Sequence, residues 1–361
     1  MDTKVILIVA VSLVLVLVIA VGACATWRWM GRPRYVPGAL ASGEGLATPL
    51  DPPPQDGAAN TFVVAPEMEL HNYSQGEGPV VLVIHGGPGM PSYGTWAGLD
   101  RLSDRYRFVY YHQRGCGDST RPVDTFEGRN VGAHIQELDA RLGLAEQIAD
   151  IERIRRILGE EQLILLGHSY GGFLAALYAA EFPDRVSALV LVSPAELVEF
   201  PPPSGGLYAQ VERDLPDDLR DDFAAFQREV FDFRGLWTKS DADLVALQER
   251  FTPYYVAAVE QRGGVIPETN DGEGAGGWMV WAQFLSMGRR HDYSEALGAY
   301  GGPVLVLHGE HDLQPEQASR LYLDYFPQAQ FEVVDDASHF AFEEKPEAFA
   351  TTVAPFLADV G

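Results

Sequence analysis

The sequence has few cysteines, few basic residues and no metal-binding motif. Only Cys24 and Cys116 occur among 361 residues, and Cys24 lies in an apolar N-terminal run, which excludes an internal disulfide scaffold. No CxxC pair or Cys/His cluster is present, so a structural zinc site is not expected. The chain has 26 basic and 51 acidic residues, which gives a net charge of −25. This charge argues against nucleic acid, anionic substrates and anionic lipid headgroups, and it suits a neutral or cationic substrate.

The composition is nevertheless that of a folded protein. Apolar residues make up 47% of the chain and charged residues 21%, which excludes wholesale disorder. A length of 361 residues leaves room for about two domains.

Residues 5–26 form an uncharged run dominated by Val, Leu, Ile and Ala. A helix of this length spans roughly 30 Å, the thickness of the hydrocarbon core of a bilayer, and the Trp and Arg residues that follow favour an interface. We therefore expect residues 1–28 to attach the protein to a membrane, and a retained span is favoured over a cleaved signal peptide. A lipoprotein signal ending at Cys24 is a third interpretation. The side of the membrane stays open.

Residues 29–60 are rich in Pro and Gly and are predicted to be a linker. After them, short apolar runs alternate with helical patterns, which predicts an α/β fold with a mostly parallel sheet and helices on both faces. The predicted strands are 80–84, 107–111, 163–166, 188–192, 303–307 and 330–334, and the clearest helices are 144–158 and 173–182. These elements assign residues 61–195 and 291–361 to an α/β core. Residues 196–290 lack strand signals and are predicted to be a helical cap.

The strongest functional signal is the sequence Gly-His-Ser-Tyr-Gly around Ser169, between a predicted strand and a predicted helix. This is the context of a nucleophile elbow, a tight turn that exposes a serine hydroxyl at a helix N-terminus. Glycines flank the serine because the turn leaves no room for side chains. We therefore predict that Ser169 is a nucleophile.

A serine nucleophile requires a base, and the base requires an acid that orients it. In an elbow-type fold the chain order is Ser, then acid, then His. Asp312 and His339 each follow a predicted strand in that order, and they are predicted to be the acid and the base. Glu310 is the nearest rival for the acid, and Asp335 and Asp336 are weaker ones.

Acyl transfer also needs two donors for the developing oxyanion. The backbone N–H of Tyr170, directly after the serine, is one candidate. The other is Gly87, in the sequence His-Gly-Gly-Pro-Gly that follows the strand 80–84.

These motifs resemble those of the α/β-hydrolase superfamily and, within it, the proline iminopeptidases. The loop at residues 85–89 matches that family's H-G-G-P-G, and residues 113–117 with Ser119 match most of its D-Q-R-G-C-G-x-S. The resemblance covers about residue 67 to the C-terminus. It implies a triad of Ser169, Asp312 and His339, a helical cap, no metal and no organic cofactor. Cys116 would then be a small packing residue near the site.

Three positions depart from the family pattern. His112 replaces the family's Asp, and the elbow lacks the peptidases' G-G-S-W-G sequence. The family's W-x-x-W-E pattern, whose Glu holds a substrate amine, here ends in Ala282. Other acids of the cap could serve, and the candidates are Glu260, Glu268 and Glu273. Among the cap aromatics, Trp278 and Trp281 are predicted to contact the substrate.

The leading functional hypothesis is a serine hydrolase that releases an N-terminal proline or small residue from short peptides. An esterase or amidase for small apolar acyl groups is the close alternative. A non-catalytic binding module on the same scaffold is a remote one, because the complete Ser, Asp, His order weighs against it.

Overall fold

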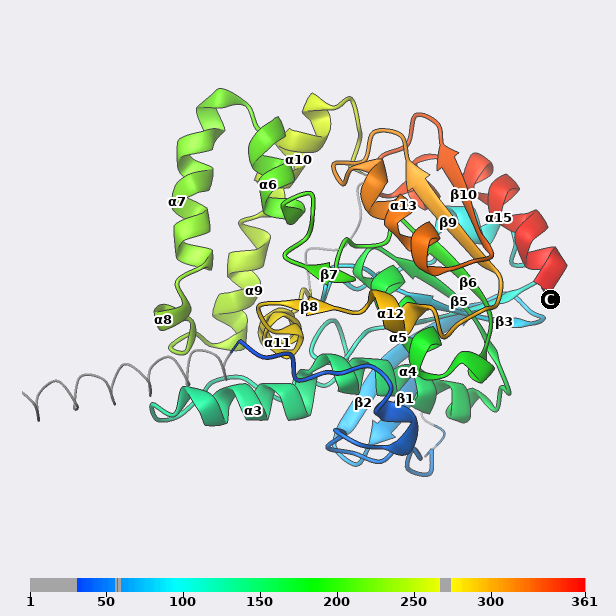
Figure 1. Ribbon diagram of the computed structural model, residues 1–361, viewed down its shortest axis with the longest axis horizontal. Helices are drawn as coiled ribbons and strands as arrows, with labels where there is room; N and C mark the ends of the chain where they lie inside the picture. The colour runs from blue at the N-terminus through cyan, green and yellow to red at the C-terminus, as the bar shows by residue number, and fades with distance from the viewer. Residues whose placement is uncertain (1–30, 56, 58–59, 267–273, 361) are drawn as a thin grey trace, which may run out of the picture.

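A computed structural model of the chain describes residues 31–55, 57, 60–266 and 274–360. Its centre is an eight-stranded sheet with the strand order β1-β2-β4-β3-β5-β6-β9-β10 (Figure 1). The strands are β1 (Thr61–Ala65), β2 (Met68–Gln75), β3 (Val80–Ile84), β4 (Arg107–Tyr111), β5 (Leu163–His168), β6 (Val186–Val192), β9 (Val304–Gly309) and β10 (Ala329–Val334). β2 runs antiparallel to both of its neighbours, and the strands from β4 to β10 are mutually parallel. The predicted α/β fold is confirmed.

The apolar runs of the central strands are buried on both faces of the sheet. Successive side chains of a strand point to opposite faces, so Val81 and Val83 join one apolar cluster while Leu82 and Ile84 join the other. The helices of the core are α2 (Ala97–Asp100), α3 (Val131–Leu142), α4 (Leu144–Leu158), α5 (Tyr170–Glu181), α12 (Ser294–Leu297), α13 (Glu316–Tyr325), α14 (Ala341–Glu344) and α15 (Pro346–Val360). The first cluster lies under α2, α14 and α15, and the second lies under α4 and α5.

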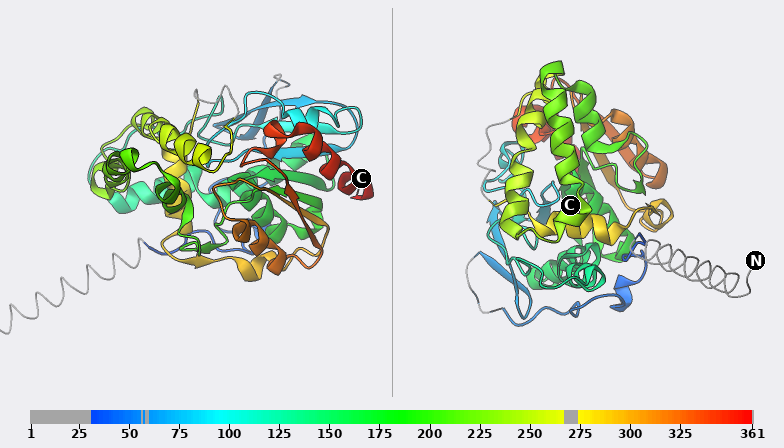
Figure 2. Two further views of the ribbon diagram at one scale, coloured as in Figure 1. Left: turned by 90° about the horizontal axis from the view of Figure 1, so that it is seen from above. Right: turned by 90° about the vertical axis from the view of Figure 1, so that its left-hand side faces the viewer.

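The predicted helical cap is present between β6 and β9. Its neck is a short antiparallel pair, β7 (Glu199–Phe200) with β8 (His291–Asp292). The cap helices are α6 (Gly206–Asp214), α7 (Arg220–Val230), α8 (Phe233–Leu236), α9 (Asp241–Glu249), α10 (Thr252–Gln261) and α11 (Trp278–Met287). Helices α6, α7 and α10 share an apolar cluster of their own, which includes Val211, Phe223, Phe226 and Val259. The buried apolar residues of α11 belong to the core cluster instead. Figure 2 shows these helices to one side of the sheet.

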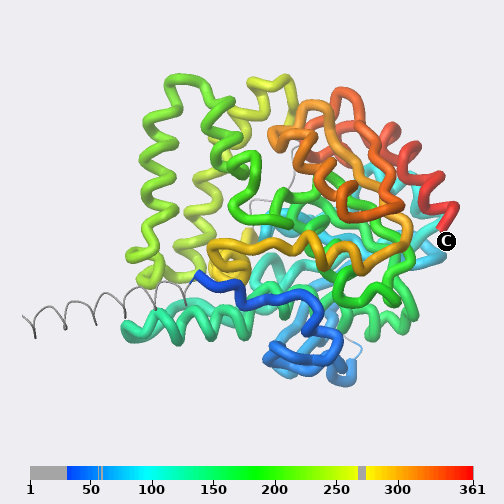
Figure 3. Tube along the Cα trace, in the orientation of Figure 1, coloured from blue at the N-terminus to red at the C-terminus, as the bar shows by residue number. Residues whose placement is uncertain are grey.

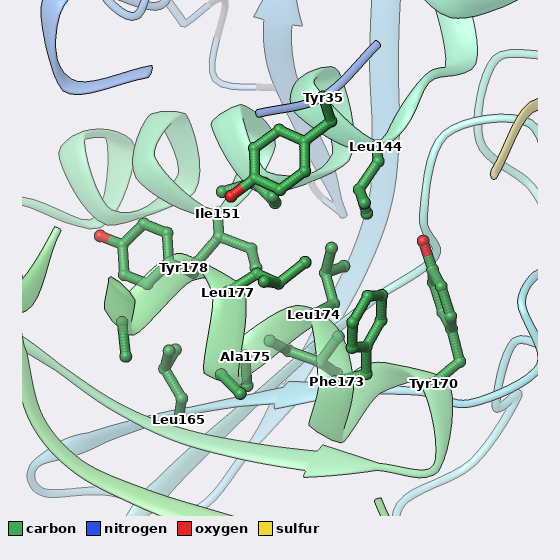
Figure 4. Packing of buried hydrophobic residues seen from close by; sticks show 14 of the residues in the cluster. Tyr35, Leu144, Ile151, Leu165, Tyr170, Phe173, Leu174, Ala175, Leu177 and Tyr178 are labelled. Atoms are coloured by element: carbon green, nitrogen blue, oxygen red, sulfur yellow. The ribbon is translucent and has the colours of Figure 1, made fainter. Parts of the chain in front are cut away.

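Residues 31–50, here called the N-terminal strap, pack on the core instead of forming the predicted free linker. Tyr35 and Leu40 are 2% and 1% exposed. The Glu181 carboxylate accepts hydrogen bonds from Tyr35 Oη at 2.8 Å, Gly38 N at 2.7 Å and Leu40 N at 3.2 Å. Figure 4 shows the Tyr35 ring against α4, near Leu144 and Ile151. The linker prediction is therefore wrong for this segment, because two apolar anchors and one carboxylate order a Pro- and Gly-rich chain.

The strap also contacts the cap. Arg34 N donates to Ser286 O at 2.7 Å, and Arg289 N donates to Gly31 O at 3.0 Å, so the strap begins beside the end of α11. From there it runs across the core helices toward β1, as the chain trace shows (Figure 3). The predicted span at residues 5–26 and Cys24 lie outside the described residues. Among the helices that are described, none is long and apolar enough to cross a membrane.

Candidate active site

The residues that sequence analysis singled out follow parallel strands, and they therefore lie at one edge of the sheet. Gly87 follows β3, Ser169 follows β5, Asp312 follows β9 and His339 follows β10. The carboxyl ends of parallel strands form the edge at which open α/β sheets bind ligands.

Ser169 occupies a sharp turn between β5 and α5. Its φ of 54° and ψ of −119° lie in a region that non-glycine residues seldom adopt. The flanking glycines are required by close backbone approach. A Cβ on Gly171 would lie 2.1 Å from Ile84 O, and one on Gly167 would lie 2.3 Å from Gly171 O. The local sequence therefore dictates the turn, as expected of a nucleophile elbow.

Asp312 and His339 form a buried pair. His339 Nδ1 lies 2.8 Å from Asp312 Oδ2, while Asp312 Oδ1 accepts a hydrogen bond from Gln314 N at 2.9 Å. Because a carboxylate only accepts, Nδ1 carries the proton and Nε2 is left as the basic nitrogen. Burial opposes the charged imidazolium, but the Asp312 charge and hydrogen bond outweigh it and raise the pKa of His339 above its usual value. Burial likewise opposes the Asp312 carboxylate, and His339 holds the pKa of Asp312 below its usual value.

Two further residues hold the His339 loop. Glu344 accepts hydrogen bonds from Ser338 N at 2.8 Å, Ser338 Oγ at 2.7 Å and Phe340 N at 3.0 Å. His168 Nε2 lies 3.0 Å from His339 O, and burial lowers the pKa of His168, so the neutral ring donates this bond. Sequence analysis did not identify Glu344. The only signal it offered was a carboxylate five residues after His339.

Gly87 and Tyr170, the predicted oxyanion donors, both lie near the elbow. Gly86, next to Gly87, packs closely on the elbow, since a Cβ there would lie 3.1 Å from Ser169 Cβ. Tyr170 N is the first amide of α5, a position at which a backbone N–H has no carbonyl partner within the helix. The Tyr170 side chain is fully buried, and its hydroxyl donates to Gln283 Oε1 of α11 at 2.8 Å.

The loop at residues 112–121 supports the Gly87 loop. Gln113 N donates to His85 Nε2 at 3.0 Å, and Gln113 Nε2 donates to His85 O at 2.8 Å. Burial lowers the pKa of His85 to about 3, so the ring stays neutral and can accept. Cys116 is fully buried, and burial raises the pKa of its thiol to about 12. A thiol in this state is a packing group and not a nucleophile.

His112, which replaces an acid of the family pattern, has both ring nitrogens engaged. Nδ1 accepts from Asp118 N at 3.1 Å, and Nε2 therefore donates to Ser92 O at 3.0 Å. His71 and the Asp118 carboxylate lie near His112. A metal could use His112 only after displacing one of these hydrogen bonds, so this group does not form a ready metal site.

The two predicted substrate tryptophans differ in position. Trp278 is fully buried, its Nε1 donates to Asp124 O at 2.8 Å, and its ring stacks on Trp237. This burial contradicts its predicted place in a substrate pocket. Trp281 is partly buried and packs against both the core and the cap clusters, so its role stays a prediction. Ala282, at the position of the missing glutamate, is fully buried. Of the candidate amine-binding acids, Glu260 is exposed on α10, and Glu268 and Glu273 lie outside the described residues.

Comparison with known proteins agrees with this architecture. Residues 79–346 match the family described as alpha/beta hydrolase fold. The chain belongs to the α/β-hydrolase family. Among curated proteins, this family member is 25% identical over 295 residues to a proline iminopeptidase of Heyndrickxia coagulans, with 79% of the chain and 92% of the relative covered. A proline iminopeptidase of Lactobacillus acidophilus is 25% identical over 290 residues, with 77% of the chain and 89% of the relative covered.

Solved structures show the same fold at lower identity. The crystal structure of VinJ superposes with a TM-score of 0.59 at 19% identity and covers 86% of this α/β-hydrolase chain and 100% of its own. A proline iminopeptidase of Mycobacterium smegmatis superposes with a TM-score of 0.54 at 21% identity and covers 81% and 96%. The predicted family resemblance is confirmed.

Proposed function

We propose that this α/β hydrolase is a serine hydrolase that acts through an acyl-enzyme. The observation that supports the proposal most is the 2.8 Å Asp312–His339 pair at the sheet edge where Ser169 occupies its elbow. In this mechanism His339 Nε2 accepts the Ser169 hydroxyl proton while Oγ attacks a substrate carbonyl. Asp312 holds the imidazole in the required tautomer and stabilises its charged form.

The remaining steps use the same groups. The amides of Gly87 and Tyr170 donate to the oxyanion of the tetrahedral intermediate, and one such donor contributes on the order of 10²- to 10³-fold in kcat. His339 then passes its proton to the leaving amine or alcohol, which leaves Ser169 acylated. Water attacks the acyl-enzyme with His339 as the base, and the free acid and Ser169 are released.

For the substrate, we propose the N-terminal proline or small residue of a short peptide. The H-G-G-P-G loop and the 25% identity to proline iminopeptidases over 79% of the chain support this choice. A second candidate is an ester or amide with a small apolar acyl group. It is favoured by the buried Ala282 at the position where the peptidase pattern has an amine-binding glutamate.

The first experiment tests the nucleophile. We expect Ser169→Ala to lose on the order of 10⁴-fold or more in kcat while keeping its melting temperature. Wild type should react with a fluorophosphonate probe at Ser169, as shown by peptide mass spectrometry, and the variant should not. A variant that keeps a tenth of the wild-type rate, or a wild type that does not react, would refute the proposal and leave the binding module.

The second experiment separates the two substrate classes. Prolyl arylamide, N-acetyl-prolyl arylamide and short-chain aryl esters are compared at matched concentration. An aminopeptidase must pair the substrate ammonium with a carboxylate, since burying it unpaired costs several kcal/mol, an order-of-magnitude figure. Loss of turnover on acetylation is therefore expected. Equal or better turnover of the acetylated substrate would reject the aminopeptidase and leave the esterase or amidase.

A further inference from the structure

One short segment of the cap, residues 262–265 after α10, contacts both loops that carry the Asp312–His339 pair. The side chain of its first residue, Arg262, connects helix α6 of the cap to the loop of Asp312. Arg262 Nε donates to Asp214 Oδ2 of α6 at 2.8 Å, and Nη1 donates to the backbone carbonyl of Asp312 at 2.5 Å. The planar fork of a guanidinium allows one side chain to bond both partners. The Arg262 and Asp214 side chains are 30% and 20% exposed, so the link is partly shielded from water.

The acid loop is also held by apolar packing against the cap. Leu313, directly after Asp312, is 1% exposed. It belongs to the apolar cluster of the cap, together with Val211 of α6 and Val259 of α10. The residue that follows the catalytic acid is therefore part of the cap core, although the loop begins at a strand of the sheet.

The same cap segment reaches the histidine loop. A Cβ on Gly264 would lie 2.9 Å from Ser338 Cβ, so the two backbones approach closely at this point. Ser338 Oγ lies 3.2 Å from Val265 O. Because Ser338 directly precedes His339, residues 262–265 contact the acid loop and the histidine loop within four positions.

We propose that Arg262 is a positioning residue for the Asp312–His339 pair. By fixing the Asp312 carbonyl from the cap, it keeps the carboxylate at hydrogen-bond distance from His339 Nδ1. The role is geometric, since the Arg262 charge is already paired with Asp214. A misplacement of about 1 Å in a reacting group can cost on the order of 10²-fold in rate. The inference rests on the proposed function, because positioning matters only if His339 activates Ser169.

The kinetic test compares Arg262→Gln with Arg250→Gln as a matched control. Arg250 is also a cap arginine in an ion pair, with Glu229 at 2.9 Å, but its side chain is 54% exposed and that of Glu229 is 44% exposed. Each variant is assayed with a prolyl arylamide and with p-nitrophenyl acetate, whose acyl group is too small to depend on cap contacts. We expect Arg262→Gln to lose roughly 10- to 100-fold in kcat on both substrates, and Arg250→Gln to match wild type. A change confined to KM for the arylamide would overturn the proposal.

A second readout does not depend on turnover. The proton on His339 Nδ1, hydrogen-bonded to Asp312, should give a low-field NMR signal in the full chain labelled with ¹⁵N-histidine. We expect Arg262→Gln to shift or broaden this signal, and Arg250→Gln to leave it unchanged. An unchanged signal in Arg262→Gln would overturn the proposal. A wild type that shows the signal but hydrolyses no substrate would instead refute the proposed function, so the two failures are distinguishable.

Arg262→Lys keeps the proposal falsifiable if Arg262→Gln does not fold. Lysine keeps the charge, but it lacks the planar fork that bonds Asp214 and the Asp312 carbonyl together. We expect partial rescue, with a kcat for Arg262→Lys between those of wild type and Arg262→Gln. If Arg262→Gln does not fold, the kcat of Arg262→Lys should still be clearly below that of wild type. A lysine variant with wild-type kcat and an unchanged low-field signal would overturn the proposal.

Discussion

Ser169 has a backbone conformation that costs a serine on the order of 1–3 kcal/mol. Hydrogen bonds to both its amide and its carbonyl hold it in this conformation. The Ser169 amide donates to Val192 O at 2.9 Å, and its carbonyl accepts from Ala195 N at 2.9 Å. A Cβ on Gly167 would clash with α5 at Gly171 O, and a Cβ on Gly171 would clash with the end of β3 at Ile84 O. Strain held in this way keeps the hydroxyl side chain at the sheet edge instead of in the core.

The choice of Asp312 over Glu310 as the acid predicts a sharp difference between two neighbours. Asp312→Asn should lower kcat on the order of 10⁴-fold, because an asparagine can donate to His339 and favour the wrong tautomer. Glu310→Gln should keep near wild-type activity, because the Glu310 carboxylate is exposed and accepts from Asp336 N at 2.9 Å. Steady-state kinetics of both variants test this. An inactive Glu310 variant beside an active Asp312 variant would reverse the assignment.

Activity should depend on pH through His339, and the sign follows from its neighbours. Asp312 and Glu344 both raise the pKa of His339, whereas the nearby rings of His168 and His308 have lowered pKa values through burial and stay neutral. The base must be unprotonated, so kcat/KM should fall on the acid side with a midpoint above about 6.5, the ordinary histidine value.

Removing the Glu344 charge should move this midpoint to lower pH, because one negative charge that favours the imidazolium is lost. Glu344→Gln is the test, and Glu343→Gln is the control. The Glu343 carboxylate accepts from Ala97 N at 3.3 Å on another element, so its loss should leave the midpoint in place. A midpoint that does not move in Glu344→Gln, or that moves upward, contradicts the assignment.

At the scale of elements, the N-terminal strap is tied to the core by buried carboxylates. Besides the Glu181 contacts, Glu146 accepts from Ala47 N at 2.7 Å and from Thr48 Oγ1 at 2.9 Å. Glu146 is 1% exposed and also pairs with Arg153 at 3.0 Å. A buried carboxylate that loses its donors carries an unpaired desolvation cost. The strap therefore contributes to stability through acids that its absence would leave short of partners.

Two truncations test the strap. Removal of residues 1–28 leaves every one of these contacts in place, so this shorter chain should stay active. Its urea midpoint of unfolding is the reference for a protein with an intact strap. Removal of residues 1–50 exposes the sites of Tyr35 and Leu40, each worth about 1.5–3 kcal/mol of burial, and leaves Glu181 without three donors. We expect a clearly lower urea midpoint for the longer truncation. Equal midpoints would show that the strap adds nothing to stability.

The elements that could be predicted from sequence are those in which a regular pattern of apolar residues is buried. The strands at 80–84 and 107–111 and the helix at 144–158 have the predicted ends, because covered strands need unbroken apolar runs and an amphipathic helix repeats its apolar face. β2 was not predicted, since it lies near the sheet edge and mixes Met68 and Leu70 with exposed Glu69. The strap was not predicted either, because its order depends on two isolated apolar residues and on distant carboxylates of the core, Glu146 and Glu181.

The same distinction holds for the site. Ser169, Asp312 and His339 are marked by strand ends and chain order, which are local features that a sequence displays. Arg262 lies 50 positions before Asp312, and its contact with that residue depends on how the folded cap packs against the core. Trp278 shows the opposite case. The aromatic residues that recur in the cap suggested that Trp278 contacts the substrate. Its contacts with Trp237 and Asp124 instead place its side chain in the protein interior.

At the scale of the whole molecule, the candidate site lies where the cap meets the α/β core, since cap residues 262–265 contact the loops of Asp312 and His339. The N-terminal strap contacts both parts, at Ser286 of α11 in the cap and at Glu181 of α5 in the core. α11 in turn bonds the elbow through Gln283 and Tyr170. The N-terminal end of the described chain therefore lies beside a cap helix that touches the residue after Ser169.

The apolar run before the strap leads to a prediction about localisation. We propose that residues 5–26 attach the protein to a membrane, on the ground that they form an uncharged apolar run of bilayer length. The full chain should stay with membranes after an alkaline carbonate wash, and residues 29–361 should be soluble and active, because the strap contacts begin at Gly31. Recovery of the full chain in the soluble fraction would reject attachment. Cys24→Ser separates a membrane-spanning helix from a lipid anchor on Cys24. If the variant leaves the membrane and also loses the mass of a lipid, the anchor is that of a lipoprotein and not a spanning helix.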